Sequence, residues 1–261
     1  MKFVVLMKQT PDVSLVKVNA DAGEIELPVS GGTVNPYDEY PVEEVIRLKE
    51  RFGGTSVALC VGSEKSESSL RDCLALGVDE AYLACDPLFE GSDSQANARI
   101  LAAALTKLGD YTVILGGKQS ADNESGQTPA AIAALLDLPG IGAVKKISDI
   151  SGDTITMERV TDDGFDVIET TIPVVASCVK EIADPRLPSL KGKMAAKKKT
   201  IIRWSAADLG LDGSGIGDKS ATKRVKVSPP QPRPAGEFIE GETPAVIADN
   251  LYQKLKTDQA L

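Results

Sequence analysis

The sequence has no histidine among its 261 residues. This absence excludes imidazole as a general base, histidine-ligated metal ions, and serine or cysteine nucleophiles activated by histidine. No two carboxylates are placed as a general acid and base, since Asp122 and Glu124 lie close together in a loop where capping is the simpler use. We therefore expect no catalytic residue in this chain.

Aromatic residues make up only 4% of the chain, and the formal net charge is −9. Proteins that bind single-stranded nucleic acid stack the bases on aromatic side chains, and affinity for a phosphate backbone needs excess positive charge. We therefore expect no nucleic-acid partner. The sequence also has no apolar window long enough to span a bilayer, and its first apolar stretch is too short for a secretory signal. These patterns predict no membrane insertion and a cytoplasmic (bacterial) location.

Four cysteines are present, and none of them forms a CxxC pair or another spacing typical of metal ligands. Cys60, Cys85 and Cys178 lie in apolar runs, which is typical of buried free thiols. The sequence thus predicts no metal site, and it favours a reducing compartment.

Short apolar runs alternate with helical patterns along the first 140 residues. The apolar runs, which predict buried strands, cover 2–8, 55–62, 80–85 and 111–117. The helical patterns cover 35–53, 63–77 (with Ser63 as its cap), 92–109 and 128–139. This alternation predicts an α/β fold with a parallel, doubly wound sheet that is covered on both faces.

The pattern changes in the second half of the chain. Residues 153–178 alternate with period two around a "DDG" turn, which predicts an added β-hairpin beside the sheet, and "TIIRW" predicts a further strand. From residue 228 a Pro-rich connector leads into an amphipathic helix. We expect 1–227 to form the α/β domain and 228–261 to form an extended C-terminal arm that docks on a partner subunit.

Three polar loops follow predicted strands: "LMKQTPD", "CVGSEKS" and "GGKQSADNESGQTPAA" (116–131). Ligands of open α/β sheets collect at the carboxyl ends of the strands. Small residues in the third loop would let backbone N–H groups approach a phosphate at the start of the next helix. On spacing alone, an ordinary turn capped by Ser125 or Thr128 is an equal alternative, but the clustering of three loops favours nucleotide binding.

Residues 180–199, "KEIADPRLPSLKGKMAAKKK", hold seven basic and two acidic residues in a chain of negative net charge. A lysine run is usually a solvated face, and Lys197–Lys199 also suit the flank of the next strand. The positive charge would also suit acidic surfaces of a partner.

Several landmarks occur in the order known from one family. "NPYDEYPVEEVIRLKE", "GGKQSADNESGQ" and "IADPRLPSLKGKMAAKKKTI" make the chain resemble the β subunit of electron transfer flavoprotein over nearly its whole length. The resemblance implies an adenine-nucleotide-binding sheet in a heterodimer with an α subunit that holds most of the shared redox FAD. It also implies electron transfer from acyl-CoA dehydrogenases or similar flavoenzymes of fatty acid oxidation to a quinone oxidoreductase or another acceptor.

The resemblance further implies which residues form the sites. The nucleotide pocket would be lined by Leu6, Met7, Lys8, Asn35, Pro36, Tyr37, Asp38, Val61, Gln119, Ser120, Ala121, Asp122, Asn123, Glu124, Ser125, Gly126, Gln127 and Thr128. Partner docking would use Arg186, Leu187, Leu190 and Met194 in a recognition loop at about 183–199. "DPRLPSLKG" would protrude and insert Leu190 into a hydrophobic pocket of the dehydrogenase, and "KMAAKKK" would return to the body.

The nucleotide itself is left open between two ligands. Some members of the family bind AMP as a structural nucleotide, whereas electron-bifurcating members bind a second FAD in its place. The chain has "TPA" at 128–130 where AMP-binding members carry Thr-Gly-Gln, and "DNESGQTP" differs from the "DGDTAQVG"-like loop of bifurcating members. AMP is favoured, because a second redox flavin demands more of its surroundings.

Two readings from other classes compete with the electron carrier. A non-redox nucleotide-binding regulatory module would be complete without a partner, whereas the Pro-rich arm favours an obligate partner. An ATP-using enzyme would need an SGGxDS loop directly after the first strand. "SGGTVN" at 30–35 resembles that loop but follows a polar hairpin instead, so this alternative is discounted.

Overall fold

Buried strands alternate with helices along the first 140 residues, as the sequence predicts. The computed structural model describes residues 1–19, 24–26, 32–223, 225 and 235–261. The chain divides into two units, Met1–Val227 and Ser228–Leu261.

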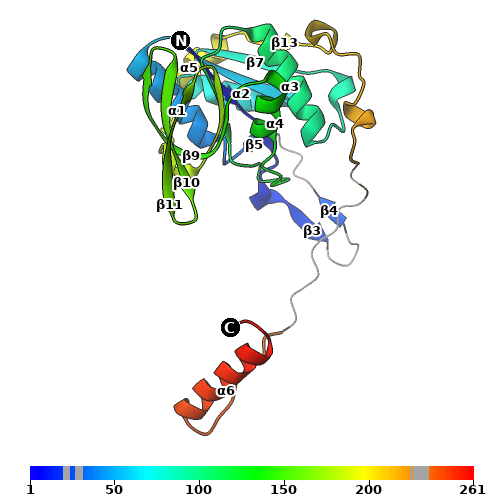
Figure 1. Ribbon diagram of the computed structural model, residues 1–261. Helices are drawn as coiled ribbons and strands as arrows, with labels where there is room; N and C mark the ends of the chain where they lie inside the picture. The colour runs from blue at the N-terminus through cyan, green and yellow to red at the C-terminus, as the bar shows by residue number, and fades with distance from the viewer. Residues whose placement is uncertain (20–23, 27–31, 224, 226–234) are drawn as a thin grey trace. The chain divides into compact units, whose positions relative to one another are not determined.

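The first unit is built on a sheet with the strand order β11-β10-β9-β12-β8-β1-β6-β7-β13 (Figure 1). Its strands are β1 (Lys2–Leu6), β6 (Thr55–Val61), β7 (Glu80–Ala84), β8 (Val113–Gly117), β9 (Gly140–Ser151), β10 (Thr154–Thr161), β11 (Gly164–Thr171), β12 (Val174–Cys178) and β13 (Ile201–Trp204). From β9 to β13 neighbouring strands run parallel, and β10 pairs antiparallel with β9 and β11. The predicted doubly wound α/β class is therefore confirmed.

The described residues also form short strands and six α-helices. The short strands pair as β2 (Gln9–Thr10) with β5 (Thr33–Val34) and β3 (Lys17–Asn19) with β4 (Glu24–Glu26). The helices are α1 (Glu39–Phe52), α2 (Glu67–Leu76), α3 (Ser94–Leu108), α4 (Thr128–Leu136), α5 (Leu190–Lys198) and α6 (Pro244–Thr257). Among the described residues no helix combines the length and the hydropathy that a membrane span requires.

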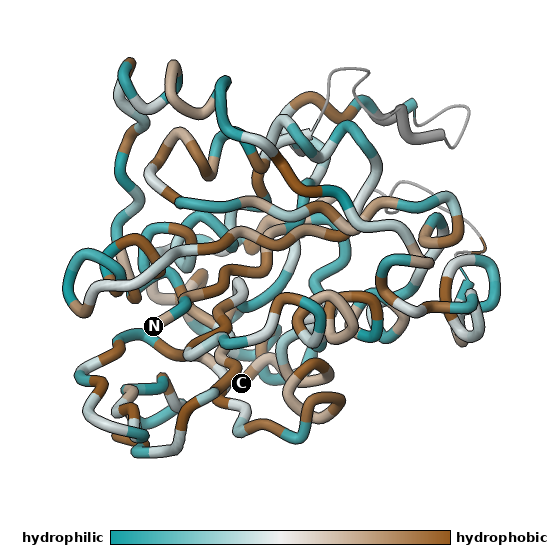
Figure 2. Tube along the Cα trace, turned by 90° about the horizontal axis from the view of Figure 1, so that it is seen from above, coloured by the Kyte–Doolittle hydropathy of each residue, from teal (hydrophilic) through white to brown (hydrophobic). Residues whose placement is uncertain are grey.

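Two hydrophobic layers hold the helices on the sheet. Along β1 the side chains of Phe3 and Val5 join one buried cluster, and those of Val4 and Leu6 join another, because successive residues of a strand point to opposite faces. Helices α1 and α2 supply residues to the first cluster, and α3 and α4 supply residues to the second. Figure 2 shows hydrophobic segments of the chain running through the middle of this unit. Burial on both faces explains their continuous apolar sequences.

The order of the strands creates a crevice beside β1. The chain steps from β1 to β6 and β7 on one side, and β8 then pairs with β1 on its other side. The connections that leave β1 and β8 therefore diverge, and the carboxyl ends of these two strands open at the switch point where doubly wound sheets bind ligands.

Glycines end several helices as the sequence indicates. Gly53 follows α1 with φ of 75° and Gly77 follows α2 with φ of 128°, both in the region that side chains rarely adopt. The predicted cap Ser63 is wrong: it precedes the short 3₁₀ helix η2 (Glu64–Ser66), and its side chain makes no capping hydrogen bond. The segment therefore turns once as a 3₁₀ helix before α2 begins at Glu67.

The predicted hairpin over 153–178 is only half right. β10 and β11 form a hairpin around Asp162 and Asp163, but β12 lies in the middle of the sheet, parallel to β8 and β9. Burial on both faces makes β12 continuously apolar at Val174–Ala176, a signal that the period-two interpretation of the whole stretch overlooked. Strand β9, the long partner of both β10 and β12, was also not predicted from the sequence.

The segment after β12 ends in a helix rather than in a loop. We expected Leu190 to protrude from a loop that continues to Gly192, but α5 begins at Leu190. The hydroxyl of Ser189 accepts a hydrogen bond from the Gly192 N–H at 3.0 Å and caps this helix. The leucine therefore occupies the first helical position.

The second unit contains the terminal helix that the sequence predicts. Thr243 caps α6 by accepting a hydrogen bond from the Val246 N–H at 3.3 Å. Ile247, Leu251 and Leu255 recur every four residues and so share one face of the helix. Ile247 and Leu251 are exposed within this unit.

Candidate functional site

A cavity of about 1020 Å³ opens at the switch point, at the carboxyl ends of β1 and β8. This volume lies at the upper end of the range of about 300–1,000 Å³ that is usual for small-molecule pockets. Fourteen of the predicted pocket residues line it: Leu6, Met7, Lys8, Asn35, Asp38, Val61, Gln119, Ser120, Asp122, Asn123, Ser125, Gly126, Gln127 and Thr128.

Four of the predicted pocket residues do not line the cavity: Pro36, Tyr37, Ala121 and Glu124. Two of the four shape its wall through their backbone. The Ala121 N–H donates a hydrogen bond to the side chain of Asn35 at 3.1 Å, and Glu124 adopts a left-handed conformation with φ of 53°. The predicted segments thus meet at one place. Most of their residues line the cavity, and others hold the loops that form its wall.

Asp38 joins the loops that follow β1 and β8. It stands at the N-cap of α1, and its carboxylate accepts hydrogen bonds from the N–H groups of Lys8 at 2.8 Å and Gly117 at 3.1 Å. Burial raises the pKa of Asp38 to about 7, although these hydrogen bonds oppose the shift. A Cβ on Gly117 would lie 2.5 Å from the Asp38 carboxylate, so glycine is required for this close approach.

Asn35 makes a second connection between the same two loops. Its backbone N–H donates to the Lys8 carbonyl at 2.9 Å, and its side-chain amide donates to the Gln119 carbonyl at 2.9 Å. The side chain also accepts a hydrogen bond from Ala121, so each polar group of this buried residue has a partner. Such complete pairing fixes the position of the two loops.

A charged pair lies at the mouth of the cavity. Lys8 Nζ lies 2.6 Å from one oxygen of Asp122 and 2.8 Å from the other. Burial raises the pKa of Asp122, but hydrogen bonds from Lys8 and Ser120 outweigh it and hold the pKa below its ordinary value. Both side chains are partly exposed, so the pair remains within reach of a ligand.

The N-terminus of α4 lies at the cavity wall, where Thr128 and Pro129 line it. Gln127 occupies the N-cap position, and no side chain caps this helix among the described residues. Neither Ser125 nor Thr128 serves as the predicted cap, since the Ser125 hydroxyl lies 3.1 Å from that of Ser94 instead. An uncapped helix start lined by Gly126 and Gln127 is suited to an anion such as phosphate.

Two segments of the cavity wall were not predicted from the sequence. The turn into α3 contributes Gly91, Ser92, Asp93, Ser94, Gln95 and Asn97, and a later turn contributes Gly217, Asp218, Ala221, Thr222 and Lys223. Asp93 connects them, because its carboxylate caps α3 at the Ala96 N–H and also accepts hydrogen bonds from Thr222. The small and polar "GSDS" after a strand was a usable signal for the first segment, whereas nothing in the spacing indicated the second.

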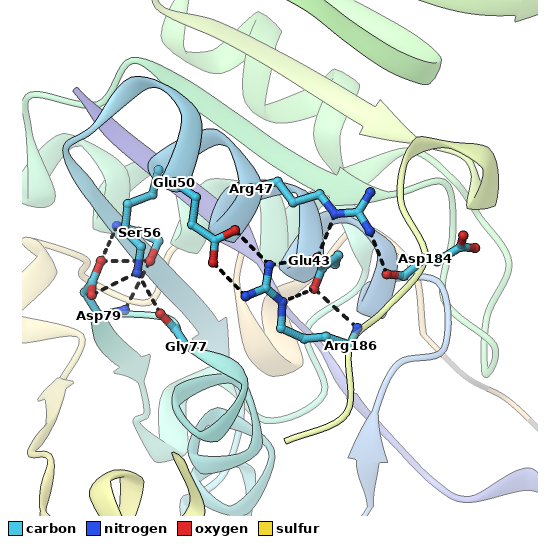
Figure 3. Close-up of polar contacts among 9 residues, drawn as sticks. Glu43, Arg47, Glu50, Ser56, Gly77, Asp79, Asp184 and Arg186 are labelled. Atoms are coloured by element: carbon cyan, nitrogen blue, oxygen red, sulfur yellow. Dashed lines mark hydrogen bonds and ion pairs between the residues drawn. The ribbon is translucent and has the colours of Figure 1, made fainter. Parts of the chain in front are cut away.

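The four predicted docking residues lie apart from the cavity and differ in exposure. Leu187, Leu190 and Met194 are 91%, 77% and 60% exposed. Arg186 instead binds two glutamates of α1, with Nε 2.7 Å from Glu43 and Nη1 2.7 Å from Glu50 (Figure 3). We refer to these three exposed apolar residues together as the patch, whereas Arg186 is held on α1.

The strand order and the polar switch-point cavity define a doubly wound α/β protein with a polar cavity at the carboxyl ends of β1 and β8. A family model described as "Electron transfer flavoprotein domain" matches residues 28–209. The chain belongs to the β subunits of the electron transfer flavoprotein family, as its sequence resemblance predicts. Its role is therefore the electron transfer of that family.

Three relatives illustrate the similarity. The chain is 36% identical to the electron transfer flavoprotein subunit beta of Thermoanaerobacterium thermosaccharolyticum over 259 residues, which cover 98% of each chain. It is 35% identical to the subunit of the same name from Bacillus subtilis over 259 residues, 99% of this chain and 98% of the relative. It is also 34% identical to the caffeyl-CoA reductase–Etf complex subunit CarD of Acetobacterium woodii over 258 residues, 98% of each chain.

Proposed function

We propose that this chain is the electron-carrying β subunit of a heterodimer, with AMP in the switch-point cavity as a structural nucleotide. The redox FAD is held mainly by the α subunit and is shared at the interface. Electrons pass from an acyl-CoA dehydrogenase or a similar flavoenzyme to an electron transfer flavoprotein–quinone oxidoreductase or another acceptor. The cofactor supplies the redox chemistry, and this chain supplies binding and position.

The observation that carries the choice of AMP is the contrast between two helix starts at the cavity. The start of α4 has no side-chain cap, and Gly126 and Gln127 beside it line the cavity. The start of α3 is already occupied by its own Asp93, whose carboxylate accepts the Ala96 N–H at 2.8 Å. One helix start is thus suited to a phosphate and the other is occupied by a carboxylate, which fits a ligand with a single phosphate.

The residues around α4 fit the rest of a mononucleotide. Gly117 leaves room where a Cβ would meet Asp38, and the apolar side chains of Leu6 and Val61 line the same cavity as the polar loop. Lys8 and Asp122 at the mouth provide a donor and an acceptor for the hydroxyl groups of a sugar. Binding needs no movement of the two loops, because Asn35 and Asp38 already hold them.

The volume of the cavity supports a second candidate, an electron-bifurcating β subunit with a second FAD. About 1020 Å³ exceeds what a mononucleotide needs, and the missed segments at 91–97 and 217–223 extend the wall beyond the α4 start. A dinucleotide would fill the extended part of the cavity. Its second phosphate would then approach the carboxylate of Asp93, and the two negative charges would repel each other.

The experiment is the release of nucleotides from the purified heterodimer, made by co-expression with the α subunit. The complex is denatured, the released nucleotides are separated by chromatography, and each is quantified against protein. One FAD and one AMP per heterodimer are expected. Two FAD would replace the AMP proposal with the bifurcating one, and a chain that binds free nucleotide without any partner would favour the regulatory module.

The C-terminal arm is proposed to dock on the α subunit. Ile247, Leu251 and Leu255 form an apolar face on α6, and two of them are exposed within their own unit. Apolar helix faces of this kind are normally covered by another protein surface. A chain that ends at residue 234 should therefore fail to form the heterodimer in size-exclusion chromatography, and co-elution with the α subunit at the normal position would contradict this assignment.

A further inference from the structure

The segment that carries the exposed leucines is fixed to α1 at its beginning. The guanidinium of Arg186 donates to Glu43 from Nε at 2.7 Å and from Nη2 at 3.0 Å, and to Glu50 from Nη1 at 2.7 Å and from Nη2 at 3.0 Å (Figure 3). The Arg186 backbone N–H also donates to Glu43 at 3.3 Å. Arg47 completes the cluster by binding Glu43 at 2.7 Å and the Asp184 carbonyl at 3.1 Å.

The far end of the segment is fixed to α2. A Cβ on Gly192 would lie 2.3 Å from the Ala75 carbonyl, which shows how closely α5 approaches α2. Ala196 is buried in the same contact, and Arg71 donates to its carbonyl at 3.0 Å. The stretch from Leu187 to Met194 is therefore held on both sides.

Between these fixed ends the surface is apolar with a basic rim. Leu187, Leu190 and Met194 are exposed, and Leu190 and Met194 lie four residues apart on one side of α5. Lys191 and Lys193 flank them. The sequence suggested that the leucines lie on a protruding loop, whereas the structure holds their segment at both ends. A held segment loses less conformational entropy when a partner binds.

Arg186 itself has little left to offer a partner. Three of its nitrogen atoms already bind carboxylates, and the side chain is only 35% exposed. The cluster of Glu43, Arg47, Glu50 and Arg186 holds two positive and two negative charges, so it adds little to long-range steering.

We propose that Arg186 is a positioning residue for electron transfer: by binding Glu43 and Glu50 of α1, it holds Leu187 and Leu190 in the arrangement that a partner flavoenzyme recognises. This proposal rests on the proposed docking role of Leu190. It assigns the arginine to pre-organisation of the patch and not to direct contact with the partner.

The experiment is a double-mutant cycle in the complete heterodimer. Flavin reduction is followed in stopped flow with an acyl-CoA dehydrogenase, reduced by its acyl-CoA substrate, as the donor. Leu190→Ala should raise KM for the dehydrogenase about 30-fold, as expected for a central apolar anchor. Arg186→Gln should raise KM about five- to tenfold, because ordering is then completed on binding. In both variants kcat, FAD content and reduction by dithionite should stay within twofold of the parent.

The double variant decides how Arg186 acts. If it positions Leu190, Arg186→Gln should raise KM by a clearly smaller factor in the Leu190→Ala background than in the parent, because only Leu187 then remains to be positioned. Amide hydrogen exchange at residue 186, whose N–H donates to Glu43, should also rise at least tenfold in Arg186→Gln. Effects on KM that multiply, or exchange rates that do not change, would overturn the positioning role.

Two further variants separate the possible failures. Arg203→Gln is the matched control, since Arg203 also binds two glutamates, Glu67 at 2.7 Å and Glu64 at 3.0 Å, and lies outside residues 186–194, the docking segment. It should leave KM unchanged within twofold. Glu50→Gln removes one acceptor and repeats the test if Arg186→Gln does not fold. An unchanged KM in Leu190→Ala would refute the docking proposal itself, whereas a change there without one in Arg186→Gln or Glu50→Gln would refute only the positioning proposal.

Discussion

Two carboxylates, Asp38 at the N-cap of α1 and Glu43 within it, hold the loops of the cavity and the segment proposed to dock, and they do so in opposite electrostatic settings. Asp38 holds the cavity loops through backbone N–H groups of Lys8 and Gly117. Glu43, further along the helix, holds the docking segment through the guanidinium groups of Arg47 and Arg186. Both carboxylates are buried, with exposures of 5% and 3%.

The difference appears in their pKa values. Burial dominates at Asp38 and raises its pKa to about 7. Burial acts on Glu43 as well, but the hydrogen bonds from Arg186 and Arg47 outweigh it and lower its pKa below the ordinary value. The cavity loops thus depend on a group that changes charge near neutrality, whereas the docking segment depends on one that stays ionised. One helix can therefore support a pH-sensitive site and a pH-insensitive one.

The largest expected effect comes from crowding the Asp38 contact. In Gly117→Ala the new Cβ would lie 2.5 Å from the Asp38 carboxylate and 2.6 Å from the Tyr37 carbonyl. Both are fixed at the start of α1, so the cavity loops must move apart at a cost of about 3 kcal/mol. We expect loss of nucleotide from the purified heterodimer and a matching fall in the free energy of unfolding, measured in urea.

Gly142→Ala is the control for that substitution. A Cβ there would have its nearest neighbour, the Ser177 hydroxyl, at 3.8 Å, which is ordinary contact. This variant should retain its nucleotide and its stability. Full nucleotide content in Gly117→Ala would show that the Asp38 contact does not govern the cavity.

The next effect comes from neutralising the carboxylate at the other site. Glu43→Gln weakens the binding of both Arg47 and Arg186, and we expect it to destabilise the protein by about 2 kcal/mol, because charged hydrogen bonds to a buried carboxylate are lost. Nucleotide content should not change, since the cavity does not include Glu43. Glu67→Gln, which weakens the similar but more exposed pair with Arg203, should cost less than about 1 kcal/mol in the same urea titration. Equal losses in the two variants would contradict the importance of burial at Glu43.

Much of the fold and of the cavity was predictable from the sequence. The parts that were not predicted share one physical reason, which is that they depend on contacts between distant segments. Continuous apolar runs identified β1, β6, β7 and β8, and so the edge of the sheet where the cavity opens. The same rule applied to "PVVASC" would have separated β12 from the hairpin. The polar loops pointed to the cavity because small residues and carboxylates gather after strands.

The contacts that hold the two sites were beyond sequence reasoning. Arg186 binds glutamates about 140 residues earlier in the chain, and Asp93 binds Thr222 more than 120 residues later. Such pairs depend on which elements become neighbours in the sheet, and no local spacing encodes that. The sequence indicated the residue types that can form these contacts, whereas the fold chose the partners.

A pH titration sharpens the comparison at a third carboxylate of the same helix. Burial raises the pKa of Glu44 to about 7 from its ordinary value of 4.5, although Arg47 and Arg51 oppose the shift. Between these two values the folded protein binds a proton that the unfolded chain does not, so the stability present below about pH 4.5 is lost as the pH rises through 7. Glu44→Gln removes this dependence. Relative to the parent, the variant should gain about 1–2 kcal/mol between pH 5 and pH 8 in urea unfolding. Parallel pH profiles of the two proteins would contradict the raised pKa.

The smallest effect is expected where a charged pair faces solvent. Lys8 and Asp122 lie 2.6 Å apart, but their side chains are 42% and 27% exposed, so water screens their attraction. Lys8→Met should lower the free energy of unfolding by less than about 1 kcal/mol. If the pair contacts the nucleotide, the same variant should nevertheless release AMP several times faster during dialysis, because a donor at the mouth of the cavity is lost. The two measurements distinguish two roles of Lys8. A large loss of stability with normal AMP retention would show that Lys8 helps Asp38 and Asn35 to hold the cavity loops and does not bind the nucleotide.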